Sequence, residues 1–346
     1  MLLREFESLA AVAKNSLRIE PRHYDRNLDR AQAAELFRDH VELVEFETTS
    51  YCNRTCSFCP NSQIDRRSEK TSMPEATWRR IVDDLRELDY SGTIVWSRYS
   101  EPTSEKRIVE RIAEVRQAAP RARIAINSNG DYLTPAYLDR LIAAGLDRMW
   151  VDLYIGDDED YDQVAKTAHD RFLARIGKTA TVVSTTPEYF SRVHVPGFEM
   201  TAVVRNSASM LKQDLSDRGG LVQIARKTRR VAPCFAPFKH LVIDWDGSVV
   251  VCCQLRSDAN PHKSAVVSRI GEEAGLVEAY VALADWRKSL RGFGPKAPPC
   301  DTCNVYEYHA RRPAVMVSRI FGEEQLPGVR LLKRPLSRII GKSRRP

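Results

Sequence analysis

Cysteines are the residues of this 346-residue chain best suited to metal chemistry, and its eight cysteines form two separate groups. Cys52, Cys56 and Cys59 lie within one short segment near the start of the chain. The other five all lie in its last third, at Cys234, Cys252, Cys253, Cys300 and Cys303. Because no apolar run near Met1 suggests secretion, we expect these thiols to serve metal binding or catalysis rather than disulfides.

The first group has the spacing of a cluster ligand set with one position left open. Its cysteines follow the pattern C-x-x-x-C-x-x-C over residues 52–59. A [4Fe–4S] cluster normally takes four thiolates, so three leave one iron free to chelate a small molecule. A closed structural zinc site would need a fourth ligand. The triad therefore predicts a catalytic iron–sulfur cluster.

The segment CNRTCSFC, residues 52–59, resembles the signature of the radical S-adenosylmethionine (SAM) superfamily, including an aromatic residue, Phe58, before the third cysteine. The resemblance implies a [4Fe–4S] cluster that cleaves SAM reductively to methionine and a 5′-deoxyadenosyl radical, which abstracts hydrogen from an unactivated carbon. It also implies an external one-electron reductant of the flavodoxin or ferredoxin type. Phe58 is expected beside the adenine, although a plain packing role would look the same in sequence.

Further segments resemble the SAM-binding parts of the same family. Residues 99–102 (YSEP) are similar to its Gly-Gly-Glu-Pro segment, which implies that Ser100 and Glu101 contact the SAM amino group. Tyr99 and Ser100 replace the two glycines there. Ser128 and Asn129 are similar to the polar turn near the SAM ribose and carboxylate, and Asp152 follows the next predicted strand. Ordinary turn or helix-capping roles would explain these last three residues equally well.

The second cysteine group offers a complete set of four thiolates. Cys234, Cys252, Cys300 and Cys303 resemble an abbreviated SPASM/twitch module, which implies a second, auxiliary [4Fe–4S] cluster. Structural zinc could use the same four cysteines. His309 is an alternative ligand where a full SPASM module would continue.

Three further residues are candidates for direct roles in the reaction. Successive side chains of a strand point to opposite faces, so Cys253 is expected to face away from its neighbour Cys252. Cys253 is then either a small buried hydrophobe or a thiol that returns hydrogen to a substrate radical, which would give epimerisation. Asp217 and Arg218, with Arg205 and His309 as further choices, are polar candidates for handling a substrate hydroxyl proton.

Hydrophobic periodicity predicts the elements that must position these residues. Short apolar runs alternate with amphipathic helical stretches, which indicates a parallel sheet with helices outside. We expect a partial (β/α)6 barrel whose loops after each strand surround one cavity. The predicted strands are 44–49, 93–98, 123–127, 148–154, 179–184 and 200–205, and the predicted helices are 74–88, 105–118, 135–144 and 158–176.

The pattern changes after residue 220. Two short strands, 240–244 and 248–253, flank Asp246-Gly247, which is a strong hairpin signal, and a helix is expected over 276–290. We therefore predict an N-terminal helical extension (1–43), a radical SAM partial barrel (44–215), a small auxiliary-cluster domain (216–312) and a basic tail (313–346).

Charge and hydropathy exclude some classes of function. The net charge of +7 is matched by seven basic residues after Pro327 with no acid among them, so the remainder is near neutral and no nucleic-acid partner is expected. The apolar residues of this tail suggest an amphipathic or merely solvated helix. No apolar stretch is long enough for a membrane span, and we expect a cytoplasmic protein.

The chain's modest size and single auxiliary set resemble the family branch that acts on cyclitols, aminoglycosides or nucleoside sugars in natural-product and antibiotic biosynthesis. We therefore expect a small carbohydrate-like substrate that is dehydrogenated or epimerised. A peptide-modifying maturase and a sugar-acid radical decarboxylase are alternatives within the family. A zinc-binding scaffold without catalysis is the alternative outside it.

Overall fold

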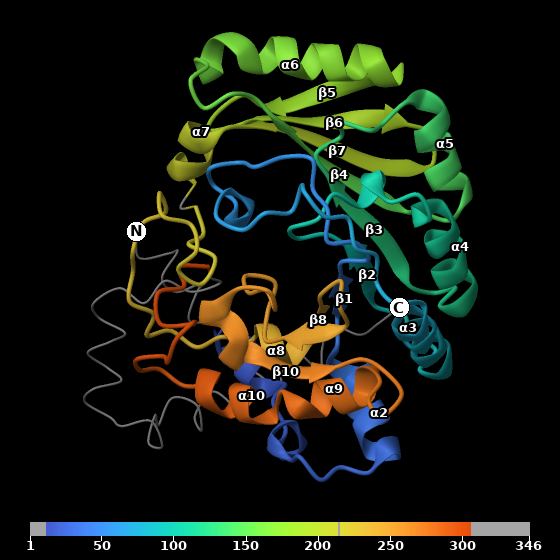
Figure 1. The fold of residues 1–346 in the computed structure, drawn as a ribbon, viewed down its shortest axis with the longest axis vertical. Coiled ribbons are helices and arrows are strands. Elements are labelled where there is room, and N and C mark those ends of the chain that lie inside the picture. Colours follow the sequence, from blue (N-terminus) through green and yellow to red (C-terminus); the bar gives the residue numbers. More distant parts are fainter. Residues whose placement is uncertain (1–11, 214, 306–346) are drawn as a thin grey trace, which may run out of the picture.

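The computed structural model describes residues 12–213 and 215–305, and within them ten strands form one open mixed sheet in the order β10-β9-β8-β1-β2-β3-β4-β7-β6-β5 (Figure 1). His309 and the predicted tail, 313–346, lie outside the described residues. The described part contains no helix that is both long enough and apolar enough to cross a membrane.

Six neighbouring strands form the parallel centre of the sheet, which agrees with the predicted fold class. Predicted strands 44–49, 93–98, 123–127, 148–154 and 200–205 correspond to five of them. The six are β8 (His240–Ile243), β1 (Leu43–Phe46), β2 (Thr93–Trp96), β3 (Arg123–Ser128), β4 (Arg148–Tyr154) and β7 (Phe198–Arg205).

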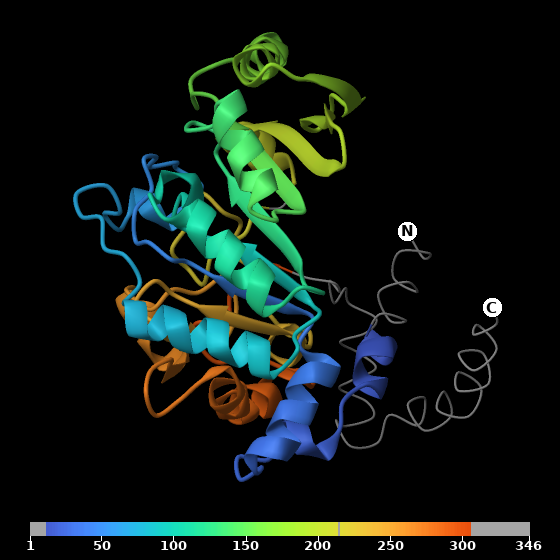
Figure 2. The same ribbon diagram turned by 90° about the vertical axis from the view of Figure 1, so that its right-hand side faces the viewer.

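The predicted strand 179–184 exists, but it is not one of the parallel strands. It is β5 (Thr179–Ser184), which pairs antiparallel with β6 (Tyr189–Val195), a strand that was not predicted. Only residues 185–188 separate the two, and a parallel crossover needs a dozen or more residues. β6 in turn pairs antiparallel with β7, so this hairpin extends the sheet beyond the parallel centre (Figure 2).

Helices between the parallel strands cover the outer face of the sheet (Figure 2). Each buries a stripe of apolar side chains, and in α3 this stripe includes Trp78, Ile81 and Leu85, as predicted. Trp78 packs edge-on against Phe46 of β1, with ring centroids 5.6 Å apart. The covering helices are α3 (Glu75–Glu87), α4 (Ile108–Ala118), α5 (Pro135–Ala143) and α6 (Tyr161–Ile176).

The second cysteine region shares the same sheet. β8 and β9 (Ser248–Val250) form the predicted hairpin, in which Gly247 adopts a left-handed φ of 84°. A Cβ at this glycine would come within 3.0 Å of Thr77. The second strand ends at Val250 rather than at 253. Because β8 pairs with β1, this region is joined to the central sheet, and the predicted domain boundaries stay a prediction.

The remaining elements pack around this sheet. The predicted helix 276–290 is divided at Leu283 into α9 and α10, and α2 packs against α9. Their bounds are α2 (Arg30–His40), α7 (Ser207–Lys212), α8 (Ala236–Lys239), α9 (Leu276–Ala282), α10 (Ala284–Leu290) and β10 (Val266–Arg269). Short 3-10 helices lie at η1 (Pro21–Tyr24), η2 (Pro60–Ser62), η3 (Pro102–Ser104) and η4 (Asn260–Ala265).

Candidate active site

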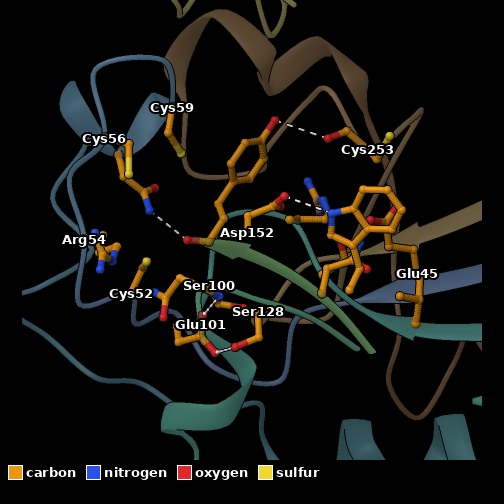
Figure 3. A pocket seen from close by; sticks show the side chains of 18 of the residues that line it. Glu45, Cys52, Arg54, Cys56, Cys59, Ser100, Glu101, Ser128, Asp152 and Cys253 are labelled. Carbon is orange, nitrogen blue, oxygen red and sulfur yellow. Dashed lines mark hydrogen bonds between the residues drawn. The ribbon is translucent and has the colours of Figure 1, made fainter. Parts of the chain in front are cut away.

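One cavity of about 560 Å³ gathers most of the residues that the sequence singled out (Figure 3). It lies inside the curved parallel sheet and includes the carboxyl ends of the strands, where the loops carrying these residues begin. The predicted residues that line it are Cys52, Cys56, Cys59, Phe58, Ser100, Glu101, Ser128, Asn129, Asp152, Arg205, Arg218 and Cys253. Asp217 and the four cysteines of the second set are not part of its lining.

The triad loop is tied to the turn after β3 by one carboxylate. Arg54 donates to both oxygens of Asp131, at 2.6 and 2.7 Å, and Asn53 donates to Oδ2 of the same residue at 2.7 Å. Asn129 in turn donates to Asn53 Oδ1 at 2.8 Å. Both residues that follow Cys52 are therefore fixed to the turn that carries Ser128 and Asn129.

The three thiols fit a shared cluster. Burial raises the pKa of Cys52 and of Cys56 to about 12, and the charge of Cys59 contributes to both shifts. Burial also raises the pKa of Cys59, and nearby Arg218 opposes that shift. The described residues contain no group of three or more His, Cys, Asp or Glu side chains placed to hold a single metal ion. Three thiols on one short loop that line a common cavity beside Arg218 suit a multi-iron cluster whose ligands are thiolates.

Glu101 organises the SAM-binding turns. It is 2% exposed, and its carboxylate accepts from Thr103 N and Oγ1 at 3.0 and 2.5 Å, from Ser128 Oγ at 2.7 Å and from Asn129 N at 2.7 Å. Burial raises the pKa of Glu101, and these hydrogen bonds oppose the shift. The carboxylate thus joins the turns after β2 and β3, which were predicted separately.

Glu47 is a residue of this site that the sequence analysis missed. Its fully buried carboxylate accepts from Tyr99 N at 2.8 Å and from Ser100 N at 2.6 Å, and Arg66 lies 3.4 Å away. The backbone donors at the two positions that replace the family's glycines are therefore already used. The signal was present, since Glu45 and Glu47 alternate in a buried strand and so point to one side.

Tyr99 forms a wall of the cavity rather than an open glycine turn. The Tyr99 hydroxyl donates to the carbonyl of Cys253 at 3.2 Å, and the Asn61 side chain donates to the backbone carbonyl of Tyr99 at 2.8 Å. The guanidinium groups of Arg98, Arg218 and Arg256 lie 5.2, 5.8 and 5.0 Å from its ring centroid. Through its backbone carbonyl and its side-chain hydroxyl, Tyr99 thereby links the loop after Cys59 to the second cysteine region.

Asp152 and Phe58 lie in different parts of the cavity. Asp152 accepts from Trp150 Nε1 at 2.8 Å and pairs with Arg205 at 3.1 Å, so it has fixed partners at the end of β4. Phe58 lies 5.2 Å from the Tyr154 ring. Its other neighbours are apolar residues of the segment after α7, among them Val222 and Ala225.

Arg218 and Cys253 reach the cavity, whereas Asp217 does not. Arg218 has a left-handed φ of 51°, and among the described residues its guanidinium pairs with no carboxylate and its Nε has no hydrogen-bond partner. Burial raises the pKa of the Cys253 thiol to about 11. Asp217 instead accepts from Gly219 N at 3.2 Å, and its own N–H donates to Asn304 at 3.3 Å.

The second cysteine set lies together behind the cavity. Burial raises the pKa of Cys252, and the charges of the other three members contribute to the shift. Arg230 donates to Cys303 Sγ at 3.5 Å. The segment after β9 is a turn rather than a strand, and it directs Cys252 to the set while Cys253 lines the cavity. Four thiolates are the full number of ligands that such a cluster takes.

Comparisons with known proteins agree with this geometry. Residues 46–188 match the model of the radical SAM superfamily, and residues 234–304 match that of an iron–sulfur cluster-binding domain, SPASM. The second match favours iron over zinc at the second set.

Two curated proteins are similar in sequence. The S-adenosyl-L-methionine-dependent 2-deoxy-scyllo-inosamine dehydrogenase of Niallia circulans is 28% identical over 76% of this chain and 92% of its own length. A tungsten-containing aldehyde ferredoxin oxidoreductase cofactor-modifying protein of Pyrococcus furiosus is 24% identical over 61% of this chain and 71% of its own.

A solved structure is similar in fold. The structure of BtrN in complex with AdoMet and 2-DOIA shares 24% identity, covers 78% of this chain and 98% of its own, and superposes with a TM-score of 0.54. The triad, the shared cavity and the two domain matches lead to one conclusion: residues 46–188 form a radical SAM domain, and residues 234–304 form a C-terminal SPASM iron–sulfur cluster-binding domain.

Proposed function

We propose that this enzyme dehydrogenates a secondary alcohol on a small, carbohydrate-like molecule such as an aminocyclitol. The observation that carries the proposal is the shared cavity lined by the triad, the SAM-binding turns and Arg218, which has no carboxylate partner among the described residues. The Niallia circulans relative, named as a dehydrogenase of a cyclitol amine, supports this substrate class.

Bound SAM and the cluster at the triad would supply a 5′-deoxyadenosyl radical, which takes one hydrogen atom from the substrate carbon. The chain's own residues bind and orient the alcohol. Arg218 offers N–H donors to the substrate oxygen, where negative charge develops as the hydroxyl proton leaves. Glu45, 6% exposed and also lining the cavity, offers a carboxylate to a substrate amine or hydroxyl.

The redox balance is complete without another oxidant. The alcohol loses two electrons and two protons in becoming a ketone, and SAM becomes methionine and 5′-deoxyadenosine. The first electron leaves within the abstracted hydrogen atom, and the second replaces the electron used to cleave SAM. The four-thiol set behind Cys253 supports this return, because a fully ligated cluster is suited to electron transfer rather than to binding a second SAM.

The test is an anaerobic assay with SAM, dithionite and a substrate panel of aminocyclitols, nucleosides, sugar acids and short peptides. We expect 5′-deoxyadenosine and a ketone in equal amounts from an aminocyclitol. Carbon dioxide from a sugar acid, or a modified peptide, would overturn the proposal in favour of the decarboxylase or the maturase.

Epimerisation is the second candidate, because Cys253 lines the same cavity. A thiol that returns hydrogen to the substrate exchanges with solvent, so epimerisation in deuterium oxide places deuterium on the product carbon. Dehydrogenation places none there. A deuterated epimer from the wild type, absent with Cys253→Ala, would replace the dehydrogenase proposal.

A further inference from the structure

Residues 222–230 pack against both predicted cluster loops and carry three exposed cations. Arg226, Lys227 and Arg229 are exposed, and none of them forms an ion pair or hydrogen bond through its side chain within the described residues. Ile224, just before them, is 41% exposed although it is apolar. We refer to Ile224, Arg226, Lys227 and Arg229 as the basic strip.

The N-terminal end of this segment is anchored on the catalytic cluster loop. Val222 and Ala225 are buried against Phe58, the residue before Cys59, and Cys56 packs against the same group. Ala225 directly precedes the first cation of the basic strip, so the strip begins beside the triad loop.

The C-terminal end of the segment is anchored on the auxiliary cysteine loop. Thr228 donates to the carbonyl of Thr302 at 2.9 Å, and Arg230 N donates to that of Asp301 at 2.6 Å. Both acceptors lie between Cys300 and Cys303. The basic strip therefore spans the surface between the two predicted clusters, in the yellow segment of Figure 1.

We infer that the basic strip is the docking surface for an acidic one-electron carrier of the flavodoxin or ferredoxin class. The inference rests on the proposed function, because SAM cleavage requires one electron from outside the chain in the first turnover. Unpaired cations accelerate the encounter with an acidic partner, and a small patch with an apolar member suits a weak, transient electron-transfer complex.

The position of the basic strip serves both electron events. The reduced carrier loses one electron as the catalytic site gains one for SAM cleavage. Oxidation of the alcohol to the ketone returns one electron, and a carrier oxidised at the same surface takes it up and gives it back for the next SAM cleavage. Neither event changes a bond in the carrier.

The experiment compares two charge-reversal variants of the reconstituted full chain. The test variant is Arg226→Glu/Lys227→Glu/Arg229→Glu. The control is Arg38→Glu/Lys263→Glu/Lys288→Glu, which makes the same change of charge at exposed residues of other elements. Each protein is titrated with oxidised flavodoxin by calorimetry at low and at high salt, and 5′-deoxyadenosine formation is driven either by reduced flavodoxin or by dithionite.

We expect the test variant to bind flavodoxin about tenfold or more weakly at low salt and to lose flavodoxin-driven turnover in proportion. Its dithionite-driven rate should equal that of the wild type, because dithionite needs no docking surface. Unchanged flavodoxin binding would overturn the inference. This holds also if the variant loses binding to RNA or to vesicles instead. So would an equal loss in the control variant.

The two proposals fail in distinguishable ways. If no protein cleaves SAM with dithionite, the proposed function fails while the calorimetric comparison still tests the docking surface. If dithionite supports turnover in all three proteins and flavodoxin binds them equally, only the docking surface is wrong.

Discussion

Glu101 is a buried carboxylate that fixes the segments predicted to bind SAM. Its two oxygens accept from a backbone N–H and a hydroxyl of Thr103, from the Ser128 hydroxyl and from Asn129 N. The donors lie at the carboxyl end of β3 or in the segments that follow β2 and β3. The carboxylate is thus the internal support of the SAM-binding turns. Three of the four hydrogen bonds fall on Oε1, and Oε2 accepts only from Asn129 N.

Replacing Glu101 with Gln should weaken SAM binding without removing the cluster. The new amide NH₂ would face N–H and O–H donors, and hydrogen bonds to charged groups contribute about 1.5–3 kcal/mol each, so we expect the KM for SAM to rise tenfold or more. Iron content should be unchanged. Glu105→Gln is the matched control, because Glu105 is also buried but pairs with Arg111 outside the cavity. An unaltered KM in Glu101→Gln would contradict this account.

Arg218→Met should separate SAM cleavage from substrate oxidation. The methionine preserves much of the side-chain volume but removes the donors that we assign to the substrate oxygen. Losing such a donor typically lowers kcat by about 10²–10³-fold. We expect ketone formation to fall by that factor while 5′-deoxyadenosine forms in excess over product. The experiment measures both products in one reaction. A strict one-to-one ratio at the reduced rate would argue against this role.

At the level of residues, the sequence singled out side chains that line the cavity but missed residues that support them. The triad, Glu101 and Cys253 were identifiable because spacing and motif directly carry their chemistry. Asp131 was not, because it acts on a segment distant in sequence that only the fold brings close. For Glu47 the alternation with Glu45 indicated a buried carboxylate, but not that it binds the turn after β2. Asp217 was predicted from its position between two modules. In the structure its carboxylate accepts a hydrogen bond from the backbone N–H of Gly219.

The element that positions the cluster is a loop, and Asp131 is its main external tie. An exposed ion pair contributes little, but here one carboxylate receives a bidentate arginine and an asparagine with both side chains partly buried. We predict that Asp131→Asn releases iron several times faster than the wild type when challenged with a chelator, with SAM absent. Asp89→Asn, which removes the exposed partner of Arg121, should behave like the wild type. Equal rates of iron release in all three proteins would contradict the prediction.

Strand direction was the part of the fold that periodicity could not predict. Alternation identifies strands, and an intervening amphipathic helix such as 158–176 indicates a crossover, so the parallel centre followed from the pattern. Beyond Ile176 no helix separates β5 from β6, and both valines at 182 and 183 are exposed, as expected of an edge rather than of a buried centre. The absence of a helical interval was the usable signal for an antiparallel hairpin.

The whole molecule should contain two clusters, and metal analysis tests this directly. With four irons in each cluster, reconstituted wild type should bind about eight irons. Cys52→Ala/Cys56→Ala/Cys59→Ala and Cys234→Ala/Cys300→Ala/Cys303→Ala should each bind about four, and only the first should lose all 5′-deoxyadenosine formation. About four irons together with zinc in the wild type would keep the catalytic cluster and remove the electron-transfer role of the second set.

The stability of the molecule should fall in mild acid because of His23, which lies where the N-terminal elements meet the C-terminal ones. His23 is 1% exposed, its ring lies 4.4 Å from His40 and 5.4 Å from Phe238, and its carbonyl accepts from Arg287. Burial, followed by the charges of His40 and Arg287, lowers its pKa to about 4. Between pH 6.5 and 4 the unfolded chain therefore binds a proton that the folded protein does not.

Unfolding should cost about 2 kcal/mol less at pH 5 than at pH 7 through this residue, measured by urea denaturation. His23→Gln should reduce that difference, whereas His194→Gln, at an exposed position of β6, should preserve it. Equal pH dependence in the two variants would show that His23 is not the cause.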